Sequence, residues 1–88
     1  MRVRFFTKQT CPNCKMAKDL LERFINNKGL ASLVNVEQHD LDTVDGLAEG
    51  AYYDVMSVPT LIVERDDRVV ARWDGKVPRE SDLEQAFR

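Results

Sequence analysis

The sequence lacks several features that would each point to a particular class of protein. Its 88 residues include only two cysteines and one histidine, too few for the multiple cysteine pairs of a secreted, disulfide-stapled domain. No apolar run approaches the roughly 18 residues that a membrane-spanning helix needs. Thirteen basic residues are interspersed with fifteen acidic ones, for a net charge of -2, so no basic block indicates a nucleic-acid partner.

The N-terminal stretch also lacks the marks of a secretory signal. Residues 1–6 contain two arginines, no long apolar segment and no small-residue cleavage site. We therefore expect a cytoplasmic protein that does not associate with membranes. A chain of this length corresponds to one domain, residues 1–88, and we expect it to be a monomer.

Runs rich in β-branched and aromatic residues indicate the strands of the fold. The predicted strands are 2–6, 33–39, 60–64 and 69–73. Between the last two strands, Asp66-Asp67 is a turn signal, so these two strands are expected to be antiparallel.

Helical spacing of apolar residues separates these strands. A helix is predicted over 12–28, beginning at a proline, which suits the first helical position. A second helix is predicted within 42–53, capped by Asp42 or Thr43, and Ser81 is expected to cap a short last helix. The order is β-α-β-α-β-β-α. Because strands joined through helices generally pair in parallel, we predict an α/β domain with a mixed four-stranded sheet and three helices on its two faces.

The two cysteines lie three residues apart, as Cys11-Pro12-Asn13-Cys14, between the first predicted strand and helix. One helical turn brings their sulfur atoms to the same side, close enough to form a disulfide. The start of a helix favours an anion, and a thiolate is the reactive form of cysteine. Lys8 and the other flanking lysine, Lys15, favour the thiolate as well.

These positions suggest different roles for the two sulfur atoms. We predict that Cys11, at the helix start, attacks the substrate, and that the more buried Cys14 resolves the mixed disulfide. Pro12 and Asn13 are expected to tune the redox potential. Three other interpretations remain: a structural disulfide, a zinc site within the chain, and a metal or cluster bound across a dimer. Zinc normally takes four ligands, and His39 is predicted to lie away from the cysteine loop.

A second candidate feature is Ser57-Val58-Pro59-Thr60, directly before a strong strand. A bond that precedes proline can be cis at modest cost. A cis bond would turn the backbone of Val58 outward, where its polar groups could pair with an extended substrate. From these residues alone, an ordinary trans proline that ends a loop is the favoured interpretation.

With both features in place, the chain resembles the thioredoxin superfamily over essentially its whole length. Thr7–Cys14 is similar to the glutaredoxin pattern around the cysteines, and Tyr53–Thr60 matches the thioredoxin stretch that leads into its Pro-Thr pair. Trp73, Gly75 and Pro78 resemble the NrdH-redoxins. These are glutaredoxin-shaped proteins that behave like thioredoxins and supply electrons to ribonucleotide reductase.

The resemblance implies a thioredoxin-like fold in which Pro59 follows a cis bond. The residues that it implies for substrate binding are Lys8, Val58, Pro59, Thr60 and Gly75. Two positions depart from the family patterns. Residues 73–78 lack the paired glycines with which glutaredoxins grip glutathione, and Phe5 stands where thioredoxins have a buried acid.

We therefore expect a thiol–disulfide oxidoreductase that reduces protein disulfides by dithiol exchange, without a cofactor or a metal. By resemblance, its target is a disulfide-containing protein such as ribonucleotide reductase. Its reductant is either a thioredoxin-reductase-like enzyme or glutathione. The alternatives are a glutathione-dependent glutaredoxin and, from another class, a metal or iron–sulfur binding module.

Overall fold

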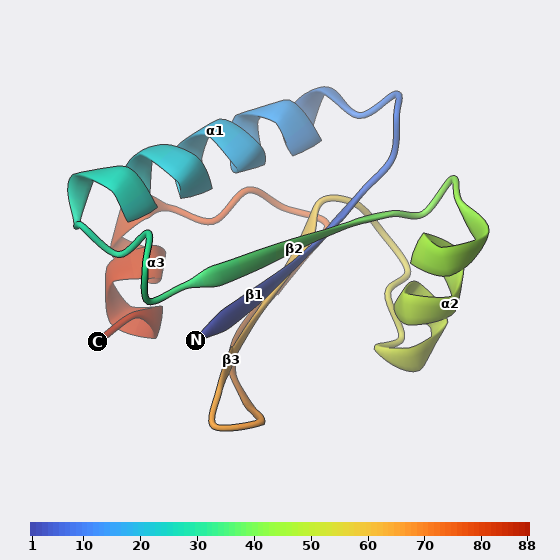
Figure 1. Cartoon of the computed structure of the whole chain (residues 1–88). Helices are drawn as coiled ribbons and strands as arrows, with labels where there is room; N and C mark the ends of the chain where they lie inside the picture. Colours follow the sequence, from blue (N-terminus) through green and yellow to red (C-terminus); the bar gives the residue numbers. More distant parts are fainter.

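A computed structural model describes all residues, 1–88, and confirms the predicted order of elements (Figure 1). The predicted boundaries differ from the observed ones by at most two residues, the usual uncertainty of an element's ends. None of the helices has the length and apolar character of a membrane span. The elements are β1 (Arg2–Thr7), α1 (Pro12–Asn27), β2 (Asn35–Asp40), α2 (Val44–Tyr52), β3 (Thr60–Arg65), β4 (Arg68–Asp74) and α3 (Glu80–Ala86).

The four strands form one mixed sheet in the order β2-β1-β3-β4. β1 pairs in parallel with β2, as expected, but β3 runs antiparallel to β1, so the prediction of parallel pairing was wrong for β3. The lengths of the helices explain the difference. The 16-residue α1 carries the chain back along the sheet, whereas the 9-residue α2 stays near the end of β2 (Figure 1). β3 therefore starts at the end of the sheet where β2 stops.

The two faces of the sheet are covered differently. α1 and α3 lie over one face, and the main core forms between them and alternate residues of β1 and β3 (Figure 1). The buried residues of this core are Val3, Phe5, Cys14, Ala17, Leu21, Phe24, Ile25, Val34, Leu61, Val63 and Leu83. Phe6 and Ile62 are fully buried on the opposite face, which we call the α2 face. The core thus contains one of the two cysteines.

Local hydrogen bonds show why the helices begin where they do. Thr43 caps α2 as predicted, because its hydroxyl oxygen accepts a hydrogen bond from the Gly46 N–H at 3.0 Å. The prediction of Ser81 as a cap was wrong: α3 begins earlier, after Arg79. There the Asp82 carboxylate accepts a hydrogen bond from the Arg79 backbone N–H at 3.0 Å. This bond holds the pKa of the Asp82 carboxyl below its usual value.

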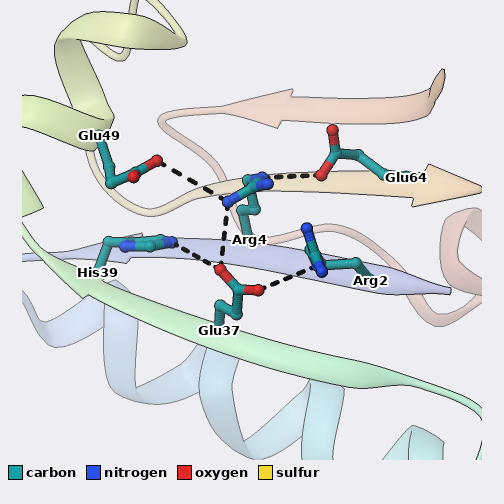
Figure 2. A network of polar contacts seen from close by, with 6 residues as sticks. All are labelled: Arg2, Arg4, Glu37, His39, Glu49 and Glu64. Carbon is teal, nitrogen blue, oxygen red and sulfur yellow. Dashed lines mark hydrogen bonds and ion pairs between the residues drawn. The ribbon is translucent and has the colours of Figure 1, made fainter. Parts of the chain in front are cut away.

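A polar network crosses the α2 face, centred on the Arg4 side chain, which is only 13% exposed (Figure 2). The Arg4 guanidinium donates to Glu64 at 2.7 Å and to Glu37 at 3.2 Å, and Glu49 lies at 3.8 Å. Its central carbon stacks over the Tyr53 ring, 4.7 Å from the ring centre. Burial lowers the pKa of Arg4, but the hydrogen bond and charge of Glu64 help to give a net upward shift. Arg4 thus joins three elements through one side chain.

Arg2 and His39 extend this network at its edge (Figure 2). Arg2 forms one ion pair with Glu37, at 3.0 Å, and its side chain is 46% exposed. The Nε2 atom of His39 lies 3.6 Å from the same carboxylate, and its ring stacks on Phe6 at 5.0 Å. His39 therefore belongs to the α2 face, whereas Cys14 belongs to the core on the other face. This agrees with the prediction that His39 lies away from the cysteine loop.

Replacement of Arg4 tests how far this network supports the sheet. We expect Arg4→Gln to lower the free energy of unfolding by about 2–3 kcal/mol, because Glu64 is left shielded from water without its partner. Arg2→Gln removes an arginine from the same strand face but loses an exposed pair, so its cost should stay below about 1 kcal/mol. Urea unfolding at neutral pH measures both, and equal losses would refute the central position of Arg4.

Candidate active site

The cysteine pair lies at the N-terminus of α1, where the sequence predicts it. Cys11 is the residue that caps the helix, with extended backbone angles, and Pro12 occupies the first turn. The Cys11 Sγ atom accepts a hydrogen bond from the Cys14 backbone N–H at 3.2 Å. The two cysteines form a disulfide, with their Cα atoms 5.2 Å apart. Pro12 and Asn13 are exposed between them.

The two cysteines differ in their access to solvent. Cys14 is only 4% exposed and belongs to the hydrophobic core, whereas Cys11 is partly exposed at its edge. No acidic residue stands in the first turn of α1, so the free N–H groups at the helix start face no competing carboxylate there. The site is therefore suited to a thiolate at Cys11, which is also the sulfur atom that a bulky substrate can reach.

Beside the disulfide is a hollow of about 240 Å³, which we call the lysine hollow. The residues that give it its character are Lys8, Cys11, Cys14, Lys15, Lys18 and Gln38. Asp40 adds one carboxylate to the wall, and Phe5 adds an apolar surface. Phe5 is buried and its partner on β2 is Gln38, so neither residue supplies an acid behind Cys14.

On the other side of β1, the chain enters β3 through residues 57–59, which we call the proline loop. The Val58–Pro59 bond is cis, as the resemblance implies. The backbone N–H and carbonyl of Val58 make no hydrogen bond within the chain. Thr60 is fully buried, and its hydroxyl donates to the Ser57 carbonyl at 2.7 Å, so this side chain shapes the loop from inside. The loop therefore presents backbone groups.

Gly75 meets the proline loop from the end of β4. Its φ of +69° is a left-handed conformation, and a Cβ atom at this position would lie 2.6 Å from the Ser57 hydroxyl oxygen. No L-residue with a side chain fits there unless Ser57 moves. The structure thus brings Gly75, an exposed residue that the resemblance implies for the site, against the loop that carries Val58.

One contact that positions the site could not be read from the sequence. Gln9, in the loop before Cys11, donates its backbone N–H to the Asp42 carboxylate at 2.9 Å. The sequence suggested Asp42 only as a candidate helix cap, a position that Thr43 takes. Because the two residues lie far apart along the chain, no local pattern indicates this bond.

No three His, Cys, Asp or Glu side chains lie close enough together to hold a metal ion.

Replacement of Gly75 tests its close approach to the proline loop. We expect Gly75→Ala to destabilise the protein by more than the roughly 1–2 kcal/mol that a left-handed backbone costs an ordinary residue. Gly29→Ala is the matched control, since Gly29 has a φ of +66° but no atom within 4 Å of the added Cβ. Urea unfolding compares the two. Ser57→Gly should recover part of the difference in the Gly75→Ala background, and equal losses for both alanine variants would contradict the steric explanation.

Solved structures of several thioredoxins are similar to this chain over nearly its whole length. Thioredoxin 1 of Thermosipho africanus superposes with a TM-score of 0.77 at 18% identity, covering 99% of this chain and 90% of that one. Thioredoxin O2 of Arabidopsis thaliana gives 0.79 at 20% identity, covering 98% and 70% of the chains. Deadhead, a germline-specific thioredoxin of Drosophila melanogaster, gives 0.73 at 24% identity, covering 98% and 76%.

The similarity to these structures shows a shared fold, and a family profile that matches the sequence identifies the family. Among curated proteins, none matches this chain. The family profile described as the thioredoxin domain matches residues 1–88, from end to end. With the pair Cys11–Cys14 in disulfide-forming position on this fold, the chain belongs to the thioredoxin family of disulfide oxidoreductases.

Proposed function

We propose that this protein reduces disulfides in other proteins by dithiol exchange and serves as an electron donor. The observation that carries the proposal is the asymmetry of the pair: Cys11 is accessible at a helix start, whereas Cys14 is held in the core directly behind it. An accessible sulfur atom can form an adduct with a large substrate, and a shielded one can only complete the exchange. A structural disulfide requires no such difference.

The exchange conserves atoms and electrons over two steps. The Cys11 thiolate attacks one sulfur atom of the substrate disulfide, which forms a mixed disulfide and releases the other substrate sulfur as a thiolate. Cys14 then loses its proton and attacks the Cys11 sulfur atom, and the second substrate sulfur leaves as a thiolate. The substrate has gained two electrons, and the protein holds the Cys11–Cys14 disulfide that the structure contains.

The proline loop is the proposed binding site for the substrate backbone. The N–H and carbonyl of Val58 are free of internal partners, and they lie beside the end of β1, because Phe6 pairs with Thr60 in the sheet. An extended segment of the substrate can pair with both groups, as in the addition of a strand. This arrangement fixes the substrate disulfide next to Cys11 without requiring a particular side chain.

The further details of the proposal rest on the resemblance. The segment around Trp73 and Gly75 favours a donor of the NrdH-redoxin type, with ribonucleotide reductase as a target and a thioredoxin-reductase-like enzyme as reductant. The absence of paired glycines between residues 73 and 78 argues against glutathione as the natural partner. We further propose that the protein acts as a monomer in the cytoplasm, where a reducing environment keeps the pair ready to donate electrons.

A trapping experiment tests the roles of the two cysteines. We expect Cys14→Ser to accumulate a mixed disulfide with a disulfide-containing protein such as insulin, because the second step is blocked. Cys11→Ser should form no adduct and show no turnover. Non-reducing gels and intact mass detect the adduct. If Cys11→Ser is trapped and Cys14→Ser is not, the assignment of the attacking sulfur is reversed.

A redox titration separates the two candidate reductants. We expect the wild-type pair to form an internal disulfide in glutathione buffers with a potential near about -270 mV, the value for thioredoxins, and no glutathione adduct at Cys11. Thiol trapping and intact mass measure both quantities. A stable adduct and a potential of about -200 to -230 mV would instead favour the glutaredoxin function.

A further inference from the structure

The two edge strands of the sheet differ in how well they are protected against pairing with a further strand. β4 carries a register shift against β3, and Arg68 and Arg72 stand on it; irregular register and charge both discourage further pairing. β2 pairs with β1 in an unbroken register and contains no proline, lysine or arginine. The carboxylate of Glu37 on β2 is already paired with arginines of β1 (Figure 2). β2 is therefore the less protected edge.

The backbone of β2 turns its polar groups alternately toward β1 and away from the sheet. The Asn35 N–H donates to the Met1 carbonyl at 2.8 Å, and in a parallel ladder every second residue makes such bonds. Val36 and Gln38, which lie between the residues bonded to β1, therefore direct their N–H and carbonyl groups outward. Both residues are exposed, so these groups are open to a further strand.

Neighbouring segments limit the length of this open edge. At one end, the Asp40 carbonyl accepts a hydrogen bond from the Thr43 N–H at 3.0 Å, and a Cβ atom at Gly46 would overlap the Asp40 backbone, so the start of α2 covers it. At the other end, the Val34 N–H is bonded to the Leu30 carbonyl at 3.0 Å, but the Val34 carbonyl has no partner. The open stretch is therefore residues 34–38.

A second copy of this chain supplies an edge that matches this stretch. In an antiparallel pair centred on Val36, the N–H and carbonyl of Val36 bond to the same groups of the second copy, and the Gln38 N–H donates to the Val34 carbonyl of the second copy. The side chains pair without conflict. Val36, which is 41% exposed, faces Val36 of the second copy, and the Asn35 amide can donate to the opposite Glu37 carboxylate.

The other antiparallel registers fit less well. A pair centred on Glu37 would place two carboxylates directly opposite each other, which is destabilising. A pair centred on Gln38 would extend to Asp40, whose outward backbone the start of α2 already covers. The register centred on Val36 is therefore the one that uses the open groups and opposes no like charges.

We propose that two copies of this protein associate through residues 34–38 of β2, so that their sheets join into one. This association goes beyond the proposed disulfide exchange. Cys11 lies outside the paired stretch, so each copy keeps its own cysteine pair and the single chain remains the reacting unit. The contact is short compared with the roughly 800 Å² that each partner of a stable complex buries, so we expect a weak dimer, with a dissociation constant on the order of 100 µM.

Sedimentation equilibrium between about 10 µM and about 1 mM measures the association. The protein is kept oxidised, so that no free thiol can link two chains. We expect Val36→Lys to weaken the dimer at least about 10-fold, because the two-fold contact would bring two like charges together. Val69→Lys is the matched control, since it adds the same charge to the other edge strand at a residue that is 52% exposed. A wild-type chain that stays monomeric throughout, or equal weakening by both variants, would overturn the inference.

Amide hydrogen exchange of the wild-type chain identifies the paired strand without any variant. We expect the Val36 and Gln38 N–H groups to exchange about 3-fold more slowly at about 1 mM than at about 50 µM, because pairing shields them, while the Glu37 N–H, which bonds to β1, changes little. Protection of residues 68–74 instead would assign the contact to β4 and refute the inference. Reduction of insulin by Val36→Lys should equal that of the wild type, so loss of the dimer is distinguishable from failure of the disulfide exchange.

Discussion

The packing of α1 against β1 and β3 is the constraint on which the site depends. One face of this helix is buried, through Cys14, Ala17, Leu21, Phe24 and Ile25. Burial of each larger apolar side chain contributes about 1.5–3 kcal/mol, so rotation of the helix would expose much of the core. Cys14 is therefore both a core residue and half of the redox pair. Because Cys14 is fixed, Cys11 is held at the preceding helix start, where its sulfur atom is accessible beside the free backbone N–H groups of the first turn.

Two tethers complete this arrangement from distant parts of the chain. The Asp42 carboxylate holds the loop before Cys11 through the Gln9 N–H, and the Thr60 hydroxyl holds the proline loop through the Ser57 carbonyl. Both bonds lie at the end of the sheet where β1 and β2 stop and β3 starts. The reversed direction of β3 is what makes this possible, since a parallel β3 would begin at the opposite end of the sheet. The fold thus brings the cysteine loop and the proline loop to the same end of the sheet.

Local signals predicted the elements well, and longer-range features only in part. Pro12 and the apolar spacing after it placed the start of α1, and with it both cysteines, correctly. The direction of β3 was wrong, because a rule for helical connections takes no account of a helix too short to recross the sheet. The Ser81 cap was wrong, because Asp82 reaches back to Arg79 and starts the helix earlier. The close contact of Gly75 with its neighbour depends on tertiary packing, which no local pattern encodes.

The two faces of the sheet use charge in opposite ways, and burial explains why. Arg4 is shielded on the α2 face, where an unpaired charge would be costly, and it meets three carboxylates there (Figure 2). Lys8, Lys15 and Lys18 are exposed, so water solvates them and the fold tolerates them without partners. A paired and shielded cation can only support architecture. Unpaired cations beside an accessible sulfur atom can still interact with a substrate that approaches that atom. The unpaired lysines lie on the side of the sheet that carries the cysteines.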